Sequence, residues 1–238
     1  MSERLFHILL SSFPKLLLAC IKVTSPLTLL IFALSLVLGF LLALVQVMDI
    51  KGLKQVTRVY IWIFRGTPLL VQLYIVFFGL PSIGVTLDAF TSAVIAFSLN
   101  SAAYNSETIR SAILSVPQGQ TEAGYMVGLS YRQIMLRIVL PQAARVAFPS
   151  LFNSFIGLTK ETSLAASITV IELFKTAQQV ASVYFEPFAL YCEAAVVYLM
   201  LNTLLTFLQS FLEKKLSWTP SQHKKPLKNI FKKEKQYA

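Results

Sequence analysis

The 238-residue chain is 55% hydrophobic and only 13% charged, and its mean hydropathy is +0.66. Soluble domains carry about a quarter of their residues as charged side chains, so the composition excludes an ordinary soluble protein and indicates a membrane protein. The formal net charge of +10 has two explanations: nucleic-acid binding, or a cationic face on the cytoplasmic side of a bilayer.

Residues 1–24 are predicted to form an N-terminal interfacial segment that lies on the bilayer. A signal peptide is not indicated, because Glu3, Arg4 and Lys15 interrupt the apolar residues and no small-residue cleavage site follows.

Five apolar stretches are predicted to span the membrane, because a bilayer core of about 30 Å needs about 20 helical residues. They are residues 25–47, 60–80, 87–104, 143–158 and 187–211. The expected fold is therefore an all-α membrane protein with about five transmembrane helices in a domain over residues 25–215. Polar residues at this depth face other helices or a watery cavity, and both roles stay open for Asn100 and Asn153.

A polar insert at residues 110–142 separates the third and fourth stretches. Thr121 can cap a helix that begins at Glu122, and Gly128 suits the turn that ends it. Ser130 and Gln133 form a capping-box pattern for a second helix, and Pro141 is predicted to set its boundary. The insert is therefore expected to be two short helices joined at residues 128–129.

A DNA-binding helix-turn-helix is one reading of this insert, since a basic second helix follows a glycine turn. Such a domain needs a third helix and its own core, whereas here spans begin on both sides. A bent arm that docks on a cytoplasmic partner fits better.

The remaining features give no evidence of catalysis. Cys20 and Cys192 have no partner at metal-ligand spacing, the two histidines lie at opposite ends of the chain, and the chain contains no phosphate-binding GxxxxGK[ST] motif. No metal, cofactor or ATPase site of the chain's own is expected. Residues 216–238 are predicted to be a disordered, Lys-rich cytoplasmic tail.

The insert resembles the EAA loop of ABC importer permeases. Glu122-Ala123-Gly124, three residues, Gly128, nine residues and then Ile138-x-Leu140-Pro141 follow the family pattern, with Gly124 where the family usually has Ala. "FRGTPLLVQL" (64–73), "SAAYNSETIRSAI" (101–113) and "PQAARVAFPSLFNSFIGLTKETSLAAS" (141–167) resemble the polar amino acid branch, and residues 66–113 are most similar to cystine permeases.

The resemblance implies a type I ABC importer permease of the bacterial cytoplasmic membrane. It would translocate polar L-amino acids, with L-cystine favoured and glutamine, arginine or histidine as alternatives. Its implied partners are a cytoplasmic ABC ATPase dimer, a second identical or homologous permease, an external substrate-binding protein and membrane lipid, but no nucleic acid. The residues implied to contact the ATPase are Glu122, Ala123, Gly124, Gly128, Leu129 and Arg132. A stand-alone secondary transporter is disfavoured, because no internal repeat is evident.

A substrate pathway is predicted at Lys160 and Glu161, which follow the fourth stretch and match a pair that the resemblance places near the cavity. Lys160 could meet a substrate carboxylate and Glu161 an ammonium group, with Asn100 and Asn153 adding neutral hydrogen bonds. The alternative is that both charges lie at the outer water boundary, with Lys160 snorkelling. Glu107 is expected to pair with Arg110 or Arg65 as a structural contact.

The distribution of positive charge predicts the topology. Of the 21 Lys and Arg residues, 15 lie in residues 48–58, residues 110–145 and the tail beyond Glu213, which five spans place on one side. Positive residues favour the cytoplasmic side, so the insert and C-terminus are expected inside and the N-terminus outside, although Lys15 and Lys22 oppose this.

A reporter fused after residue 215 should be active only in the cytoplasm. External activity of that fusion would contradict the topology.

Overall fold

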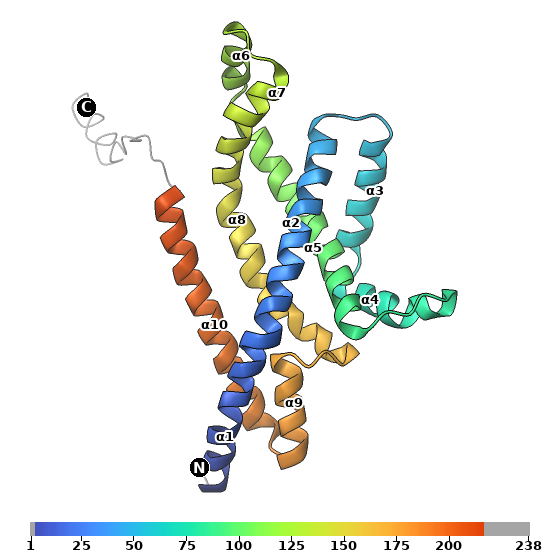
Figure 1. Ribbon diagram of the computed structural model, residues 1–238, viewed down its shortest axis with the longest axis vertical. Coiled ribbons are helices and arrows are strands. Elements are labelled where there is room, and N and C mark those ends of the chain that lie inside the picture. Colours follow the sequence, from blue (N-terminus) through green and yellow to red (C-terminus); the bar gives the residue numbers. More distant parts are fainter. Residues whose placement is uncertain (1–2, 217–238) are drawn as a thin grey trace, which may run out of the picture.

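A computed structural model of the chain describes residues 3–216, and every regular element in this range is a helix. The predicted tail lies outside the described residues except for Leu216. The elements are α1 Glu3–Ala19, η1 Cys20–Thr24, α2 Ser25–Val47, α3 Leu53–Gly66, α4 Leu69–Tyr74, η2 Ile75–Gly79, η3 Leu80–Ile83, α5 Ala89–Leu114, α6 Gln118–Met126, α7 Tyr131–Ile134, η4 Met135–Val139, α8 Leu140–Glu161, η5 Thr162–Ile168, α9 Leu173–Tyr184 and α10 Pro187–Leu216. Figure 1 shows an elongated bundle whose long helices run along one axis.

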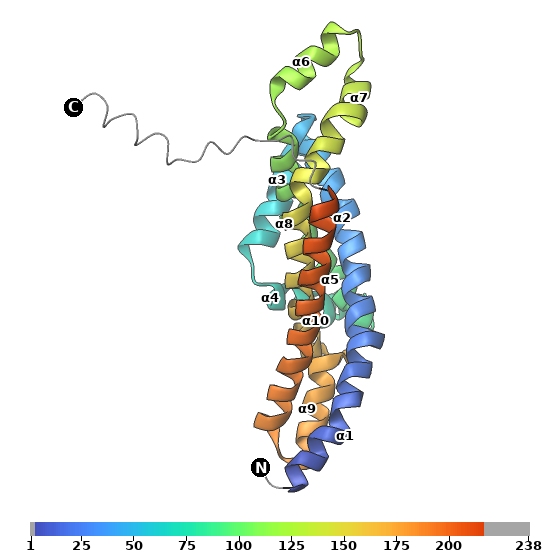
Figure 2. The ribbon, with the colours of Figure 1, turned by 90° about the vertical axis from the view of Figure 1, so that its left-hand side faces the viewer.

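The first helix is continuous from Glu3 to Val47, with one π-helical turn, η1, inside it. It has no break at residue 24, where the interfacial segment was expected to end. Its first part, α1, packs against α9 and α10 through a core cluster that includes Leu16, Leu173 and Val197. Figure 2 shows these three helices together at the N-terminal end. The placement of residues 1–24 on a membrane surface stays a prediction.

Helix α5 forms the centre of the bundle and packs closely against α2. Ser35, Gly39 and Ala43 of α2 are spaced four residues apart and face α5. A Cβ atom built on Gly39 would lie 3.1 Å from the Asn105 Cβ and 3.2 Å from the Ala102 carbonyl oxygen. Small residues at this spacing let two membrane helices approach at backbone distance. The Asn105 Nδ2 donates to the Ser35 Oγ at 3.1 Å across the contact.

The predicted second span, residues 60–80, is not one continuous helix. It divides into α3 and α4, which are bent by 105°. The cause is Pro68, which has no N–H to donate and disfavours helical geometry at the preceding residue, so Thr67 is extended with φ −120° and ψ 147°. Residues 69–83 then leave the bundle sideways (Figure 1) and are termed the side arm.

The insert, residues 118–139, forms the predicted bent pair of helices and is termed the coupling arm. The capping box at Ser130 and Gln133 is confirmed, but Thr121 is not an N-cap, because α6 begins three residues earlier, after Pro117. The predicted boundary at Pro141 is also wrong. A π-helical turn, η4, runs directly into α8, so Pro141 lies inside a continuous helix, just after a turn whose hydrogen bonds depart from the α-helical pattern.

Within residues 3–216, three helices are long and apolar enough to cross a membrane: Glu3–Val47, Tyr131–Ile168 and Pro187–Leu216. The bent pair α3–α4 would make a fourth. Helix α5 has 26 residues, which is sufficient length, but polar residues such as Asn100, Glu107 and Arg110 lower its hydropathy. The total of five spans stays a prediction.

The close α2–α5 contact generates a stability prediction. Gly39→Leu should lower the thermal midpoint of the purified protein, because overpacking at this contact costs about 1–3 kcal/mol. Gly79→Leu is the control, since a Cβ there meets only Ile75, at 3.8 Å or more. Equal melting of the two variants would contradict the backbone approach.

Candidate functional site

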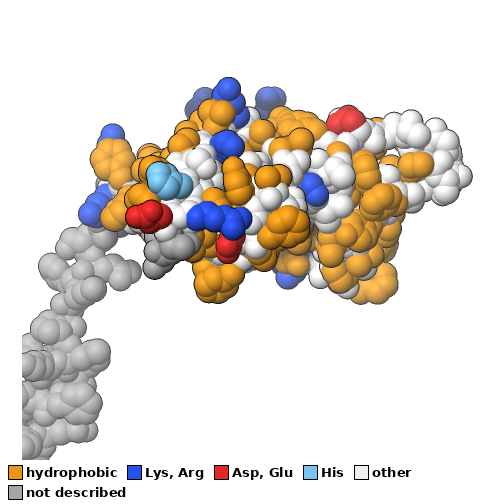
Figure 3. Space-filling model, turned by 90° about the horizontal axis from the view of Figure 1, so that it is seen from below, with side chains coloured by type: hydrophobic (Ala, Val, Ile, Leu, Met, Phe, Trp, Pro, Cys, Tyr) orange, Lys and Arg blue, Asp and Glu red, His pale blue; other side chains and the backbone are white. Residues whose placement is uncertain are grey.

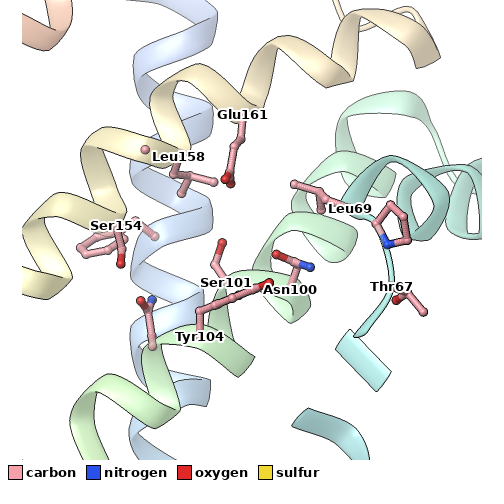
Figure 4. A pocket seen from close by; sticks show the side chains of 12 residues that line it. Thr67, Leu69, Asn100, Ser101, Tyr104, Ser154, Leu158 and Glu161 are labelled. Atoms are coloured by element: carbon pink, nitrogen blue, oxygen red, sulfur yellow. The ribbon is translucent and has the colours of Figure 1, made fainter. Parts of the chain in front are cut away.

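A cavity of about 340 Å³ lies where the α3–α4 junction, α5 and α8 meet. Its lining residues come from four parts of the chain: Phe32 of α2; Thr67, Pro68 and Leu69 at the junction; Asn100, Ser101, Tyr104 and Asn105 of α5; and Ser154, Gly157, Leu158 and Glu161 of α8. Figure 4 shows the side chains of Asn100, Ser101 and Glu161 directed into the same space from α5 and α8. The cavity thus combines a carboxylate with several neutral polar groups.

Asn100 both closes the helix break and lines the cavity. Its Nδ2 donates to the Phe64 carbonyl at 3.1 Å and to the Gln72 Oε1 at 3.0 Å. Gln72 in turn donates to the Phe64 carbonyl at 2.9 Å and to the Thr67 Oγ1 at 2.8 Å. Carbonyls at a helix end lack intrahelical partners, so these amides satisfy the end of α3. The Asn100 amide oxygen faces the cavity in Figure 4.

Asn105 is a site residue that the sequence reasoning missed. It is 1% exposed and lines the cavity, and among the described residues its Oδ1 has no hydrogen-bond partner. Buried polar atoms are normally paired, so this unpartnered oxygen, which is itself buried, is an exception beside the cavity. The sequence signal was its place in the apolar face that α5 presents to α2, where polar residues are rare.

Glu161, the last residue of α8, points into the cavity, and of the four predicted pathway residues only it and Asn100 meet there. Glu161, Lys160 and Asn153 are all exposed, but Lys160 and Asn153 do not line the cavity. The helical phase explains this, because Ser154, Leu158 and Glu161 share one face of α8 whereas residues 153 and 160 lie on a different face.

Arg65 contacts Tyr104, not Glu107. Its guanidinium carbon lies 5.3 Å from the Tyr104 ring centroid, which is a cation–π distance. Within residues 3–216, Glu107 pairs with Arg110 at 2.9 Å, so the ion pair with Arg110 is confirmed and that with Arg65 is wrong. Arg65 and Glu107 still line a second hollow of about 480 Å³, which lies further along α5 toward the coupling arm.

The coupling arm is held by a glycine turn. Gly128 has φ +79°, the Leu129 N–H donates to the Gly124 carbonyl at 3.0 Å, and the Gly128 N–H donates to the Tyr125 carbonyl at 2.9 Å. This pair of bonds is a Schellman motif, so the predicted turn is confirmed. Gly124 is buried, and a Cβ there would lie 2.8 Å from the Ile134 Cγ1, which gives a packing reason for glycine in place of alanine.

The predicted coupling residues lie on this arm with different exposure. Glu122, Ala123, Gly128 and Arg132 are exposed, Leu129 is half-buried and Gly124 is buried. Glu122 lies in the second turn of α6, so the favourable interaction expected at a helix N-terminus does not apply. The tip also exposes Met126 and Val127, which are 88% and 75% exposed. The arm extends past the ends of α2 and α3 (Figures 1 and 2).

A membrane helix bundle with a polar cavity in its wall and a protruding two-helix arm defines a multi-pass permease. The chain belongs to the family of binding-protein-dependent transport system inner membrane components, whose model matches residues 35–218.

Similar proteins support this assignment. The chain is 47% identical over 206 residues to the L-cystine transport system permease protein TcyB of Bacillus subtilis (strain 168), covering 86% of this chain and 88% of that protein. It is 44% identical over 186 residues to the probable amino-acid ABC transporter permease protein PatM of Vibrio harveyi, covering 77% and 83%. A solved amino acid ABC transporter with histidines is 32% identical, with a TM-score of 0.83, covering 90% of this chain and 100% of that one.

The glycine turn of the coupling arm generates a second prediction. Gly128→Val should raise the hydrogen-exchange rate of the Leu129 amide, because a left-handed conformation costs a residue with a Cβ about 1–2 kcal/mol. Gly119→Val is the control, since a Cβ meets nothing within 4 Å at either glycine but only Gly128 has a positive φ. Unchanged exchange in Gly128→Val would contradict the turn.

Proposed function

We propose that the chain is the permease subunit of an ATP-driven ABC importer that translocates polar L-amino acids, with L-cystine favoured. The observation that carries the proposal is the cavity, where the Glu161 carboxylate and the Asn100 amide oxygen are acceptors for a substrate ammonium group. The 47% identity to an L-cystine permease favours cystine. A permease for glutamine, arginine or histidine is the alternative, and the similar solved transporter with histidines supports it.

A second permease copy would cover the cavity. The cavity is open to the surface, since its lining residues Thr67, Ser154 and Glu161 are exposed, and a carboxylate facing hydrocarbon is costly, so protein is expected to cover the opening. The adjacent side arm exposes Ile75, Phe78 and Ile83, which are 58%, 60% and 73% exposed. An apolar arm beside an open polar cavity is suited to a protein partner that completes the cavity wall. Whether the second copy is identical or homologous is left to the assembly experiment below.

The coupling arm would dock on a cytoplasmic ABC ATPase dimer. Its exposed tip combines the apolar Met126 and Val127 with the charged Glu122 and Arg132, as in protein interfaces that mix an apolar centre with a polar rim. ATP-driven closure of the ATPases would move this arm. Helix α7 continues into α8, so it is not a separate recognition helix, which weighs against the DNA-binding alternative.

The external substrate-binding protein would meet the opposite end, with the N-terminus outside and the C-terminus cytoplasmic. Figure 3 shows the molecule from this end, where hydrophobic side chains surround a few charged ones. Phe185 and Phe188 at the α9–α10 turn are 86% and 83% exposed. Exposed apolar side chains of α2 and α10, such as Val37 and Leu204, would face membrane lipid.

The cavity generates a prediction for Glu161. Glu161→Gln keeps the shape and removes the charge, and a charge-assisted hydrogen bond contributes about 1.5–3 kcal/mol, so transport efficiency should fall about ten- to a hundredfold. The complex should still assemble with its ATPase and keep basal ATP hydrolysis. Uptake of labelled L-cystine and other L-amino acids into proteoliposomes that hold the complex, with binding protein outside and ATP inside, measures the effect.

Lys160→Gln is the matched control, because Lys160 is the exposed neighbour outside the cavity. It should transport at near wild-type efficiency. Wild-type transport by Glu161→Gln at all substrate concentrations would show that Glu161 is only a boundary residue. Loss of both assembly and transport would show that its charge is structural. Composition analysis of the purified complex distinguishes one permease species from two.

A further inference from the structure

Residues 160–171, the last two residues of α8 together with the segment that leads to α9, are termed the connector and include Glu161. It contains η5, and its side chains Ala165, Ile168 and Val170 pack into the core cluster that also holds Leu27 and Phe97. Glu161 is the second residue of this connector. Any shift of the connector relative to the bundle would therefore move the Glu161 carboxylate out of its place in the cavity.

The connector contains a strained residue. Thr169, which ends η5, has φ +69°, a left-handed conformation that is unfavourable for a β-branched side chain. Its N–H donates to the Ala166 carbonyl and the Val170 N–H donates to the Ala165 carbonyl, both at 3.2 Å. Such strain costs about 1–3 kcal/mol and persists only where the surrounding structure holds it. The connector therefore needs anchors at its ends.

Both ends of the connector are hydrogen-bonded to α10. Just before it, the Thr159 Oγ1 donates to the Asn202 Oδ1 at 3.0 Å. Just after it, the Tyr198 hydroxyl donates to the Glu172 Oε2 at 2.9 Å. Tyr198 and Asn202 are four residues apart and share one face of α10. The Asn202 Nδ2 also donates to the Tyr198 carbonyl at 2.7 Å, which fixes the orientation of its amide.

Glu172 is a fully buried anchor. It is 0% exposed, and besides the Tyr198 hydroxyl it accepts hydrogen bonds from the N–H groups of Phe174 at 2.9 Å and Lys175 at 2.7 Å. The Leu173 N–H donates to the Thr24 Oγ1 at 3.1 Å. The first three N–H groups of α9 are thus all paired with side chains. A carboxylate with three donors has a structural role in this arrangement.

We propose that Tyr198 and Asn202 are positioning residues for transport, which hold the two ends of the connector on α10 so that Glu161 faces the cavity. Neither residue lines the cavity, so they would act only through the connector. The link to transport rests on the proposed function. The mechanical part, that these two residues hold the connector in place, does not depend on it.

A transport experiment tests the action through Glu161. Tyr198→Phe and Asn202→Leu each remove one hydrogen bond, and each should raise the KM for uptake about three- to tenfold while kcat stays within about twofold. Tyr191→Phe, on the same helix at a residue that is 40% exposed, is the control and should leave KM unchanged. In a Glu161→Gln background, neither change should lower transport further. Effects that multiply with Glu161→Gln would overturn the proposal.

A spectroscopic experiment tests the anchoring without transport. A spin label at Ser167→Cys, on the exposed side of η5, reports connector mobility in the full complex in nanodiscs; Cys192→Ser removes the exposed native thiol, and Cys20 is buried. Tyr198→Phe and Asn202→Leu should each add a mobile component to the spectrum that Tyr191→Phe lacks. Unchanged spectra in both would overturn the proposal even if amino-acid uptake is observed. Increased mobility without any amino-acid uptake by the wild type would support the anchoring and contradict the proposed function.

Discussion

The close contact between α2 and α5 at Gly39 is the constraint on which the other parts of the bundle depend. Helix α5 touches α2, α3, α4 and α8, so its distance from α2 determines the position of every cavity wall. At this contact the backbone of one helix meets the backbone of the other, with the Ala102 carbonyl 3.2 Å from a Cβ built on Gly39. Between membrane helices the hydrophobic effect contributes little, and packing at such small residues supplies the attraction.

The same contact determines the polarity of the cavity. Asn105 lies against Gly39 and donates to Ser35, so its amide is fixed while its buried oxygen remains unpaired. Across the cavity, the break at Pro68 frees carbonyl groups of α3, and the amides of Gln72 and Asn100 satisfy them. The polar groups of the site therefore arise from two packing requirements, helix approach and helix termination, before any ligand is considered.

Features encoded by a few neighbouring residues could be predicted from the sequence. The capping box at Ser130 and the left-handed turn at Gly128 depend on local chemistry, and both were predicted correctly. The predicted N-cap at Thr121 is wrong because Pro117 starts the helix earlier, and the predicted second span is broken because Pro68 interrupts its apolar residues. In both cases two local signals compete, a helix-favouring one and a proline, and the sequence alone does not show which of them prevails.

The site residues were harder to predict because they depend on helix phase and on contacts between distant segments. From the sequence, Glu161 and its neighbour Lys160 are equally good candidates for lining the substrate pathway, but only Glu161 lines the cavity. Asn105 depends on the approach of α2, some 70 residues earlier in the chain. Arg65 could contact either Glu107 or Tyr104 on α5, and in the structure its guanidinium lies over the Tyr104 ring. Such choices need the three-dimensional arrangement.

The uninterrupted passage of α7 through η4 into α8 has a geometric consequence. Residues 131–161 form one helical rod about 45 Å long, with the coupling arm at one end and Glu161 at the other. If this helix pivots about one end by about 5°, the other end is displaced by about 4 Å. A displacement of this size is sufficient to break a hydrogen bond. The π-helical turn near the arm and Pro149 inside α8 are two positions where the helix can bend, because each departs from the regular hydrogen-bond ladder. The stiffness of the helix at such positions therefore determines how much of a movement of the coupling arm reaches the cavity.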